Sequence, residues 1–135
     1  MERYDGVVIG AGVVGSGVAR ELSRRAGKFL VVERALDVCE GTSKANSAII
    51  HAGFDAEPGT LKAKMNVRGN QMMDKLSEEL DIPFKRVGAF VVCLSDEDLP
   101  KLRQLYDRGA KNGVTDMELL TGGQARALQP NLSEE

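Results

Sequence analysis

Three glycines and one acidic residue in the first 33 positions have the spacing of a nucleotide-binding turn. Gly10, Gly12 and Gly15 form a Gly-x-Gly-x-x-Gly sequence directly after an apolar run at residues 7–9. In such a turn the first glycine permits the tight bend, the second lets the backbone approach a pyrophosphate, and the third lets helix and strand pack closely. Glu33 lies 23 positions after Gly10. That is close to the spacing of about 20 expected for an acid that binds ribose hydroxyls.

The same residues restrict the type of nucleotide. A pyrophosphate at this turn would lie on the N-terminus of the following helix, whose free N–H groups and partial positive charge favour an anion. A carboxylate at Glu33 would repel a 2′-phosphate, which disfavours NADP and leaves FAD or NAD. A glycine-rich turn without chemistry is the alternative for a motif of this kind. The motif here follows a strand, opens a helix and has its acid in register, so we predict binding.

The elements that position this motif are a strand, a helix and a second strand. We predict a strand at Gly6–Ile9, a helix at Val14–Arg25 and a strand at Lys28–Glu33, with the two strands parallel. The long segment Arg34–Thr60 is predicted to be a folded functional loop with a short helix near Ser43–Ala48.

Beyond residue 60 the apolar pattern changes to longer elements. Leu61–Leu80 is predicted to be an amphipathic helix, and Phe84–Leu94 a strand or a hairpin bent at Gly88. A helix is expected to start at Ser95 or Asp98 and to stop at Gly113. A short strand at Met117–Leu120 and a brief helix that opens on a capping box at Thr121–Gln124 and ends before Pro130 complete the prediction.

Composition excludes several classes of function. The chain has 135 residues, 42% of them hydrophobic, and a formal net charge of −2. Charges of both signs are intermixed, which argues against a nucleic-acid partner. Cys39 and Cys93 belong to no CxxC pair, so neither a metal site nor a disulfide framework is expected. Without a leader or an apolar run of about 18 residues, we expect a cytoplasmic protein with no transmembrane segment, and any membrane association to be peripheral.

The residues from Gly41 to Lys64 favour FAD over NAD. They read Gly-Thr-Ser-Lys-Ala-Asn-Ser-Ala-Ile-Ile-His-Ala-Gly-Phe-Asp at 41–55 and Pro-Gly-Thr-Leu-Lys-Ala-Lys at 58–64. This stretch resembles the D-amino-acid-oxidase superfamily of flavoproteins, and within it the anaerobic-type glycerol-3-phosphate dehydrogenases and the L-2-hydroxyglutarate oxidases. The resemblance implies an α/β fold in which the N-terminal βαβ unit of an FAD/NAD(P)-binding Rossmann-like domain occupies residues 1–60. Part of an α+β substrate domain would follow at 61–135.

The resemblance also implies roles for individual residues. The glycines would serve the pyrophosphate turn, Glu33 the adenosine ribose, Thr42 and Ser43 the phosphate or ribityl groups, and residues 46–48 the flavin ring. The expected FAD-binding residues are Gly10, Gly12, Val13, Val14, Gly15, Glu33, Arg34, Thr42, Ser43, Asn46, Ser47 and Ala48.

The assignment of His51 leaves two interpretations open. In the family this setting lies at the flavin and substrate side, where the imidazole would orient substrate or flavin, or act as a catalytic base. The alternative is a histidine satisfied inside a packed turn. Two interpretations are also open for Lys62 and Lys64: they lie near a phosphate, or they are ordinary solvated charges. Ala48 stands where the respiratory glycerol-3-phosphate dehydrogenases have a lysine, which favours the anaerobic or hydroxyglutarate branch.

The activity that the resemblance implies is oxidation of a secondary alcohol, most simply glycerol 3-phosphate to dihydroxyacetone phosphate. An L-2-hydroxyglutarate or related hydroxy-acid or amine oxidase is the alternative enzyme, and a non-catalytic nucleotide-binding or assembly module the alternative of another class. The electron acceptor is not assigned. Family members run to several hundred residues, so the chain is expected to be an N-terminal part that is inactive alone. A sheet of two strands has open edges, so we also expect self-association.

Overall fold

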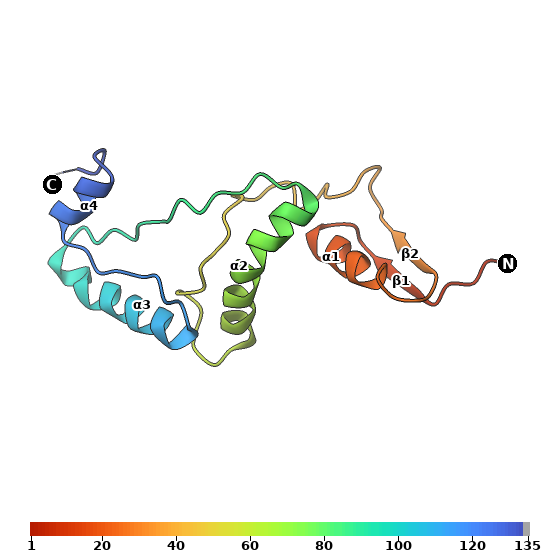
Figure 1. The fold of residues 1–135 in the computed structure, drawn as a ribbon, viewed down its shortest axis with the longest axis horizontal. Helices are drawn as coiled ribbons and strands as arrows, with labels where there is room; N and C mark the ends of the chain where they lie inside the picture. The colour runs from red at the N-terminus through yellow and green to blue at the C-terminus, as the bar shows by residue number, and fades with distance from the viewer. Residues whose placement is uncertain (134–135) are drawn as a thin grey trace. The chain divides into compact units, whose positions relative to one another are not determined.

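The computed structural model describes residues 1–133 and divides the chain into two compact units. The first unit is Met1–Ile49, and the second begins at Ile50. Figure 1 draws the helices and strands of each unit. The predicted boundary between the two domains, at residue 60, stays a prediction.

The first unit is the predicted strand, helix and strand. Its elements are β1 (Gly6–Ile9), α1 (Val13–Leu22) and β2 (Phe29–Val32). The two strands pair in parallel, with Gly6 opposite Phe29 and Ile9 opposite Val32. Helix α1 packs on both strands, as Figure 1 shows. The predicted α/β fold class with an N-terminal βαβ unit is therefore confirmed.

The core of the first unit lies on one face of this small sheet. Val8 and Ala11 are its buried apolar residues. Val7 and Ile9 alternate with Val8 along β1 and so lie on the opposite face, where they are 54% and 87% exposed. Nothing in this unit's described residues covers that second face.

The second unit consists of helices joined by irregular segments. Its elements are α2 (Leu61–Leu80), the 3₁₀ helix η1 (Asp96–Asp98), α3 (Leu99–Asn112) and α4 (Gly122–Leu128). The predicted bounds of α2 are confirmed, and the hydroxyl of Thr60 caps its first turn by accepting from the N–H of Ala63 at 3.2 Å. Gly113 ends α3 in the left-handed conformation, and the predicted capping box at Thr121 and Gln124 is present.

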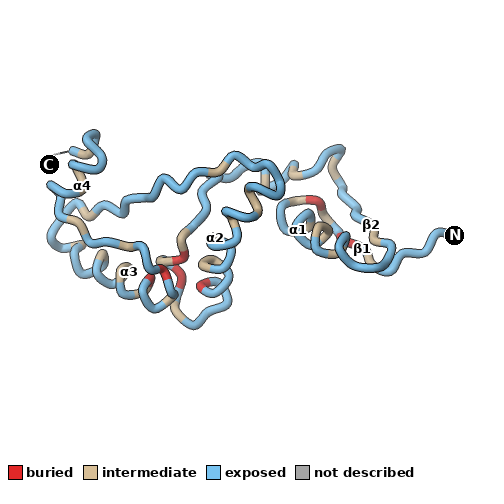
Figure 2. Tube along the Cα trace, in the orientation of Figure 1, coloured by how far each residue is buried: buried red, intermediate tan, exposed pale blue. Residues whose placement is uncertain are grey.

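The buried residues of the second unit gather where a loop meets α2 and α3. Ala56, Ala63 and Val114 are its buried apolar residues, joined by two buried glycines, Gly53 and Gly109. Figure 2 shows these positions close together. A Cβ on Gly53 would lie 2.7 Å from Cγ2 of Val67, and the φ of Gly53 is +102°. Gly53 therefore lets this loop lie directly on α2.

Three sequence predictions were wrong, and each has a physical reason. Within the described residues, 84–94 and 117–120 form no strand. A strand needs a partner for its backbone groups, and residues 84–94 have none, so Val87 and Val92 stay 83% and 54% exposed. The predicted helix at Ser43–Ala48 is a series of turns. The Asn46 side chain bonds the Ser43 carbonyl and the Ala48 N–H at 2.6 and 2.8 Å, in place of a helical ladder.

Within residues 1–133, no helix combines the length and apolar character needed to cross a bilayer.

Candidate nucleotide-binding site

The glycine turn between β1 and α1 is closed so tightly that one position excludes any side chain. Gly10 has φ +94°, which turns the chain from strand to helix. A Cβ placed on Gly15 would lie 1.9 Å from the carbonyl oxygen of Gly10. No real Cβ contact is that short, so glycine at position 15 is a steric requirement of the turn. The contact is with the turn itself more than with the strand, since the nearest atom of Val8 would be 3.5 Å away.

Both backbone groups of Ala11 are bound by segments distant in sequence. Its N–H donates to Oε2 of Glu33 at 2.7 Å. Its carbonyl accepts from the N–H of Cys39 at 3.1 Å. Ala11 is only 4% exposed, so these bonds satisfy groups that water scarcely reaches. They fix the turn to the end of β2 and to the segment that follows it.

Glu33 is therefore part of the turn as well as a candidate ribose ligand. Its second oxygen, Oε1, accepts from the N–H of Ala35 at 3.0 Å. The hydrogen bond from Ala11, then that from Ala35, lower the pKa of the Glu33 carboxyl below its ordinary value of 4.5. The group is ionised at neutral pH. Each carboxylate oxygen has a further lone pair, so Glu33 can still accept from a ribose hydroxyl.

The N-terminus of α1 offers donors to an anion. Helix N-termini leave their first N–H groups without partners in the helix, and α1 has no acidic residue in its first turn. The N–H of Val13 donates to Oγ of Ser43 at 2.9 Å. The Ser43 hydroxyl keeps its own hydrogen to donate. A Cβ on Gly12 would approach that same Oγ to 3.1 Å, so glycine lets Ser43 lie this close to the turn.

An open groove of about 640 Å³ lies over this turn. It gathers eight of the predicted cofactor-binding residues: Gly10, Gly12, Val13, Val14, Gly15, Thr42, Ser43 and Asn46. Three apolar residues that the sequence analysis did not select, Val8, Ile9 and Val18, also line it. Val18 could have been found, because it lies four residues after Val14 and so on the same face of α1.

Four predicted residues do not line this groove. Glu33 instead contacts the turn through Ala11, as described above. Arg34 is exposed, and its charge contributes to lowering the pKa of Glu33. Ser47 and Ala48 are exposed and follow the turns of residues 41–46. Ala48 has φ +53°, in the left-handed region.

Cys39 is a structural residue that sequence reasoning missed. It has φ +60°, and it supports Ala11 through its N–H and through Sγ, which lies 3.6 Å from the Ala11 carbonyl oxygen. The sequence signal was absent, because a lone cysteine in an irregular loop has no motif around it.

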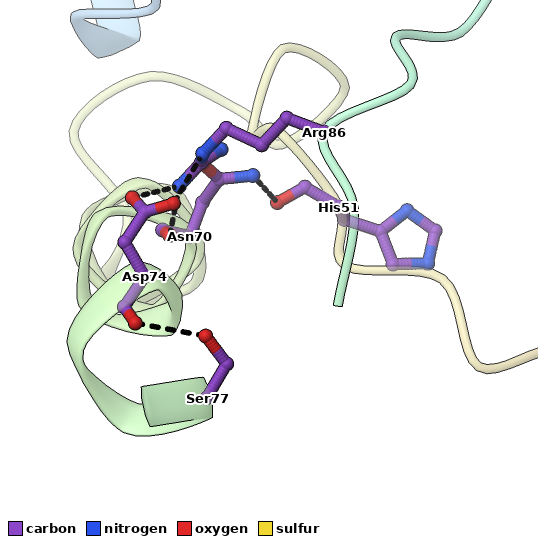
Figure 3. Close-up of polar contacts among 5 residues, drawn as sticks. All are labelled: His51, Asn70, Asp74, Ser77 and Arg86. Atoms are coloured by element: carbon purple, nitrogen blue, oxygen red, sulfur yellow. Dashed lines mark hydrogen bonds and ion pairs between the residues drawn. The ribbon is translucent and has the colours of Figure 1, made fainter. Parts of the chain in front are cut away.

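His51 belongs to the second unit. Its side chain is exposed, and its backbone carbonyl accepts from Nδ2 of Asn70 at 3.3 Å. Figure 3 shows the imidazole directed away from Asn70 and from the Arg86–Asp74 pair beside it. Lys62 and Lys64 are exposed in the first turn of α2.

Taken together, the groove of the first unit suits an extended anion. Partnerless N–H groups, a hydroxyl donor and the absence of a Cβ at Gly12 match the needs of a pyrophosphate. The apolar side chains in its lining match a flat, weakly polar group. The residues therefore fit an adenine dinucleotide.

Comparison with known proteins identifies the family. Residues 5–135 match the DAO family model, described as FAD dependent oxidoreductase. A glycerol 3-phosphate dehydrogenase of Caloramator mitchellensis is 47% identical over 97% of this chain and 27% of its own length. A mitochondrial L-2-hydroxyglutarate dehydrogenase of Arabidopsis thaliana is 42% identical over 97% of this chain and 27% of its own length. The chain thus spans about a quarter of these relatives.

A solved structure has the same fold. The dithionite-reduced L-alpha-glycerophosphate oxidase of Mycoplasma pneumoniae, with FAD bound, superimposes with a TM-score of 0.82 and 30% identity. The match covers 96% of this chain and 35% of that one.

The lowered pKa of Glu33 predicts a pH dependence of stability. Because that pKa is lower in the folded chain than in the unfolded chain, ionised Glu33 stabilises the fold at pH values above 4.5, the ordinary pKa of the group. This contribution is lost as the pH falls through the folded value. Glu33→Gln cannot accept from both Ala11 and Ala35, so it should be less stable than wild type near pH 7. The difference should narrow as the pH is lowered from 7 to 3, because protonation of Glu33 in the folded chain removes this contribution.

Urea unfolding of both proteins at the two pH values measures this effect. Glu40→Gln is the matched control, since Glu40 only pairs with Lys44 on the surface of the same unit, at 3.0 Å. A wild-type advantage over Glu33→Gln that is equally large at both pH values would contradict the assignment.

Proposed function

The chain belongs to the FAD dependent oxidoreductase family, and on that premise we propose that it is the FAD-binding part of an enzyme that oxidises a secondary alcohol. The observation that supports this most directly is the groove over the Gly10–Gly15 turn. There, Gly12 adds no Cβ to the lining of the groove, Gly15 lets the turn close, and Ser43 provides a hydroxyl beside the helix N-terminus.

In this proposal each group of the turn binds one part of the cofactor. The N–H groups of Val14 and Gly15 and the Ser43 hydroxyl hold the pyrophosphate. Glu33 accepts from the adenosine ribose through the lone pairs that Ala11 and Ala35 leave free. The remaining expected ligands, including Arg34, Ser47 and Ala48, stay proposals of the same kind.

The chemistry requires a proton acceptor from the protein. When bound, FAD supplies the acceptor for the hydride that leaves the substrate carbon. We assign the hydroxyl proton to His51, the single histidine of the chain, because an imidazole can exchange a proton near neutral pH. Its exposed side chain leaves the ring accessible to a substrate.

Glycerol 3-phosphate is the substrate that we propose. A relative at 47% identity is named for this substrate, and the solved structure is a glycerophosphate oxidase. L-2-hydroxyglutarate is the second candidate, because a relative at 42% identity is named for that substrate. A cytoplasmic location is proposed as well, and the electron acceptor is left unassigned.

Self-association of this chain is a separate proposal. Val7, Ile9 and Val32 lie on the uncovered face of the two-stranded sheet, where they are 54%, 87% and 38% exposed. A bare apolar face and two open strand edges favour pairing with a second copy.

Binding of FAD tests the assignment of the glycine turn. Gly15→Ala would place a Cβ 1.9 Å from the Gly10 oxygen, so the turn must open and the affinity for FAD should fall more than about tenfold. Gly17→Ala is the matched control within α1. Its Cβ would meet nothing within 4 Å, and it should retain FAD affinity while gaining up to about 1 kcal/mol of helix stability. Titration followed by flavin fluorescence measures both; equal affinities in the two variants would reject the assignment.

Reduction of the bound flavin tests the substrate. In a full-length enzyme that carries these residues and has FAD bound, without oxygen, glycerol 3-phosphate should bleach the flavin absorbance and 2-hydroxyglutarate should not. His51→Gln should slow the bleaching about a hundredfold or more, as expected for loss of a general base. Bleaching by 2-hydroxyglutarate alone would favour the second substrate. Bleaching by neither would favour a non-catalytic nucleotide-binding or assembly module.

Sedimentation velocity over a range of protein concentrations tests self-association. The wild-type chain should sediment faster as its concentration rises. Val7→Lys places a charge on the uncovered sheet face and should reduce this dependence, whereas Leu36→Lys, at an exposed position outside the sheet, should not. A monodisperse wild-type monomer at every concentration would overturn the proposal.

A further inference from the structure

Side chains from α2 and α3 hold the loop that contains His51 by its backbone carbonyls. We call residues 51–57 the His51 loop. Asn112 of α3 donates to the carbonyls of Gly53 and Ala56 at 2.9 and 2.7 Å. Arg108 donates to the carbonyl of Asp55 at 3.0 Å. The far end of the loop is thus tied to α3 at three points.

The near end of the loop is tied to α2 at His51 itself. Asn70 lies within α2, and its Nδ2 donates to the His51 carbonyl at 3.3 Å. That carbonyl belongs to the same peptide unit as the N–H of Ala52. A hydrogen bond at this carbonyl restricts the rotation of the peptide unit that follows the His51 Cα, to which the imidazole is attached.

Asn70 is itself oriented by a third residue. Nη1 of Arg86 donates to Oδ1 of Asn70 at 2.9 Å, and Nη2 donates to the Asn70 carbonyl at 3.0 Å. Because the amide oxygen faces Arg86, the NH₂ end must face the other way, toward His51. Figure 3 shows this chain of contacts.

Arg86 is held in turn by Asp74, one helical turn beyond Asn70. Nε and Nη2 of Arg86 donate to the two carboxylate oxygens of Asp74 at 2.8 and 2.6 Å, which is a bidentate pair. The guanidinium also lies 5.3 Å from the centroid of the Phe84 ring. The hydrogen bond to Arg86 lowers the pKa of Asp74, and that to Asp74 raises the pKa of Arg86. The pair therefore stays charged over the range in which an imidazole titrates.

From this arrangement we propose that Asn70 is a positioning residue for His51, and that the Arg86–Asp74 pair fixes the orientation of the Asn70 amide. The contacts hold the backbone of His51 and leave its imidazole, which points away from them in Figure 3, available to a substrate. The catalytic value of this role rests on the proposed function. The positioning itself is a property of the loop and does not depend on turnover.

Two variants separate the links of this chain of contacts. Asn70→Asp keeps the size of the side chain and the acceptor for Arg86, but it replaces the donor that faces the His51 carbonyl with an oxygen. Arg86→Met removes the guanidinium that orients Asn70. Lys75→Met is the matched control, because Lys75 also pairs with a carboxylate of α2, that of Glu79 at 3.5 Å.

The readouts are local and need neither cofactor nor substrate. The backbone 15N resonance of Ala52 should shift in Asn70→Asp, because its N–H shares a peptide unit with the His51 carbonyl that loses a hydrogen bond. The Hε1 resonance of His51, the only histidine, should shift in the same variant. Arg86→Met should show both effects, and the double variant should not exceed Asn70→Asp, because Arg86 acts through Asn70. Lys75→Met should show neither effect.

The outcomes decide the proposal whether or not the protein is active. An unchanged Ala52 15N resonance and an unchanged Hε1 signal in a folded Asn70→Asp would overturn it, as would additive effects in the double variant. If Asn70→Asp does not fold by circular dichroism, Asp74→Asn provides the same test with a smaller expected change. In a preparation that turns over substrate, Asn70→Asp should lower kcat and leave KM and FAD affinity unchanged. Failure of all turnover in the wild type would count against the proposed function alone.

Discussion

The distance between position 15 and the carbonyl of Gly10 is the constraint on which the first unit depends. Helix α1 begins so close to the end of β1 that even a methyl group at Gly15 would collide with the turn. This closeness aims the first N–H groups of the helix into the space above the turn, where an anion can bind. Glu33 then secures the turn from the end of β2 through the Ala11 N–H, so that one residue joins both strands to the binding surface.

The second unit is organised differently, around carbonyl groups instead of N–H groups. The His51 loop contributes no regular hydrogen-bond ladder, and four of its backbone oxygens accept from Asn70, Arg108 and Asn112 of two helices. These polar side chains thereby donate the hydrogen bonds that a neighbouring strand donates in a sheet. The small residues of the loop, above all Gly53, let it come close enough to α2 and α3 for these side chains to reach.

The sequence was informative wherever short-range rules determine structure. The capping box at Thr121 and Gln124 opens α4 and Gly113 stops α3, because these features depend on a few neighbouring residues. Glu33 could be selected as a site residue from its spacing alone, but its bond to Ala11 could not, since it depends on how β2 lies beside β1. Residues 84–94 misled the prediction, because alternating apolar residues indicate a strand only where a partner is present. Asn70 and Arg86 had no motif to identify them, since their role comes from contacts across a loop.

The contacts that make the βαβ unit span short lengths of sequence, and this affects the order of events during synthesis. Gly6 pairs with Phe29, and Glu33 bonds to Ala11, so both closures join residues fewer than 25 positions apart. Loops of this length close quickly and at modest entropic cost. The strand, turn, helix and second strand can therefore assemble soon after they leave the ribosome. The sheet face of Val7 and Ile9 is then exposed as soon as the unit forms, and apolar surface exposed at that stage favours aggregation until another surface covers it.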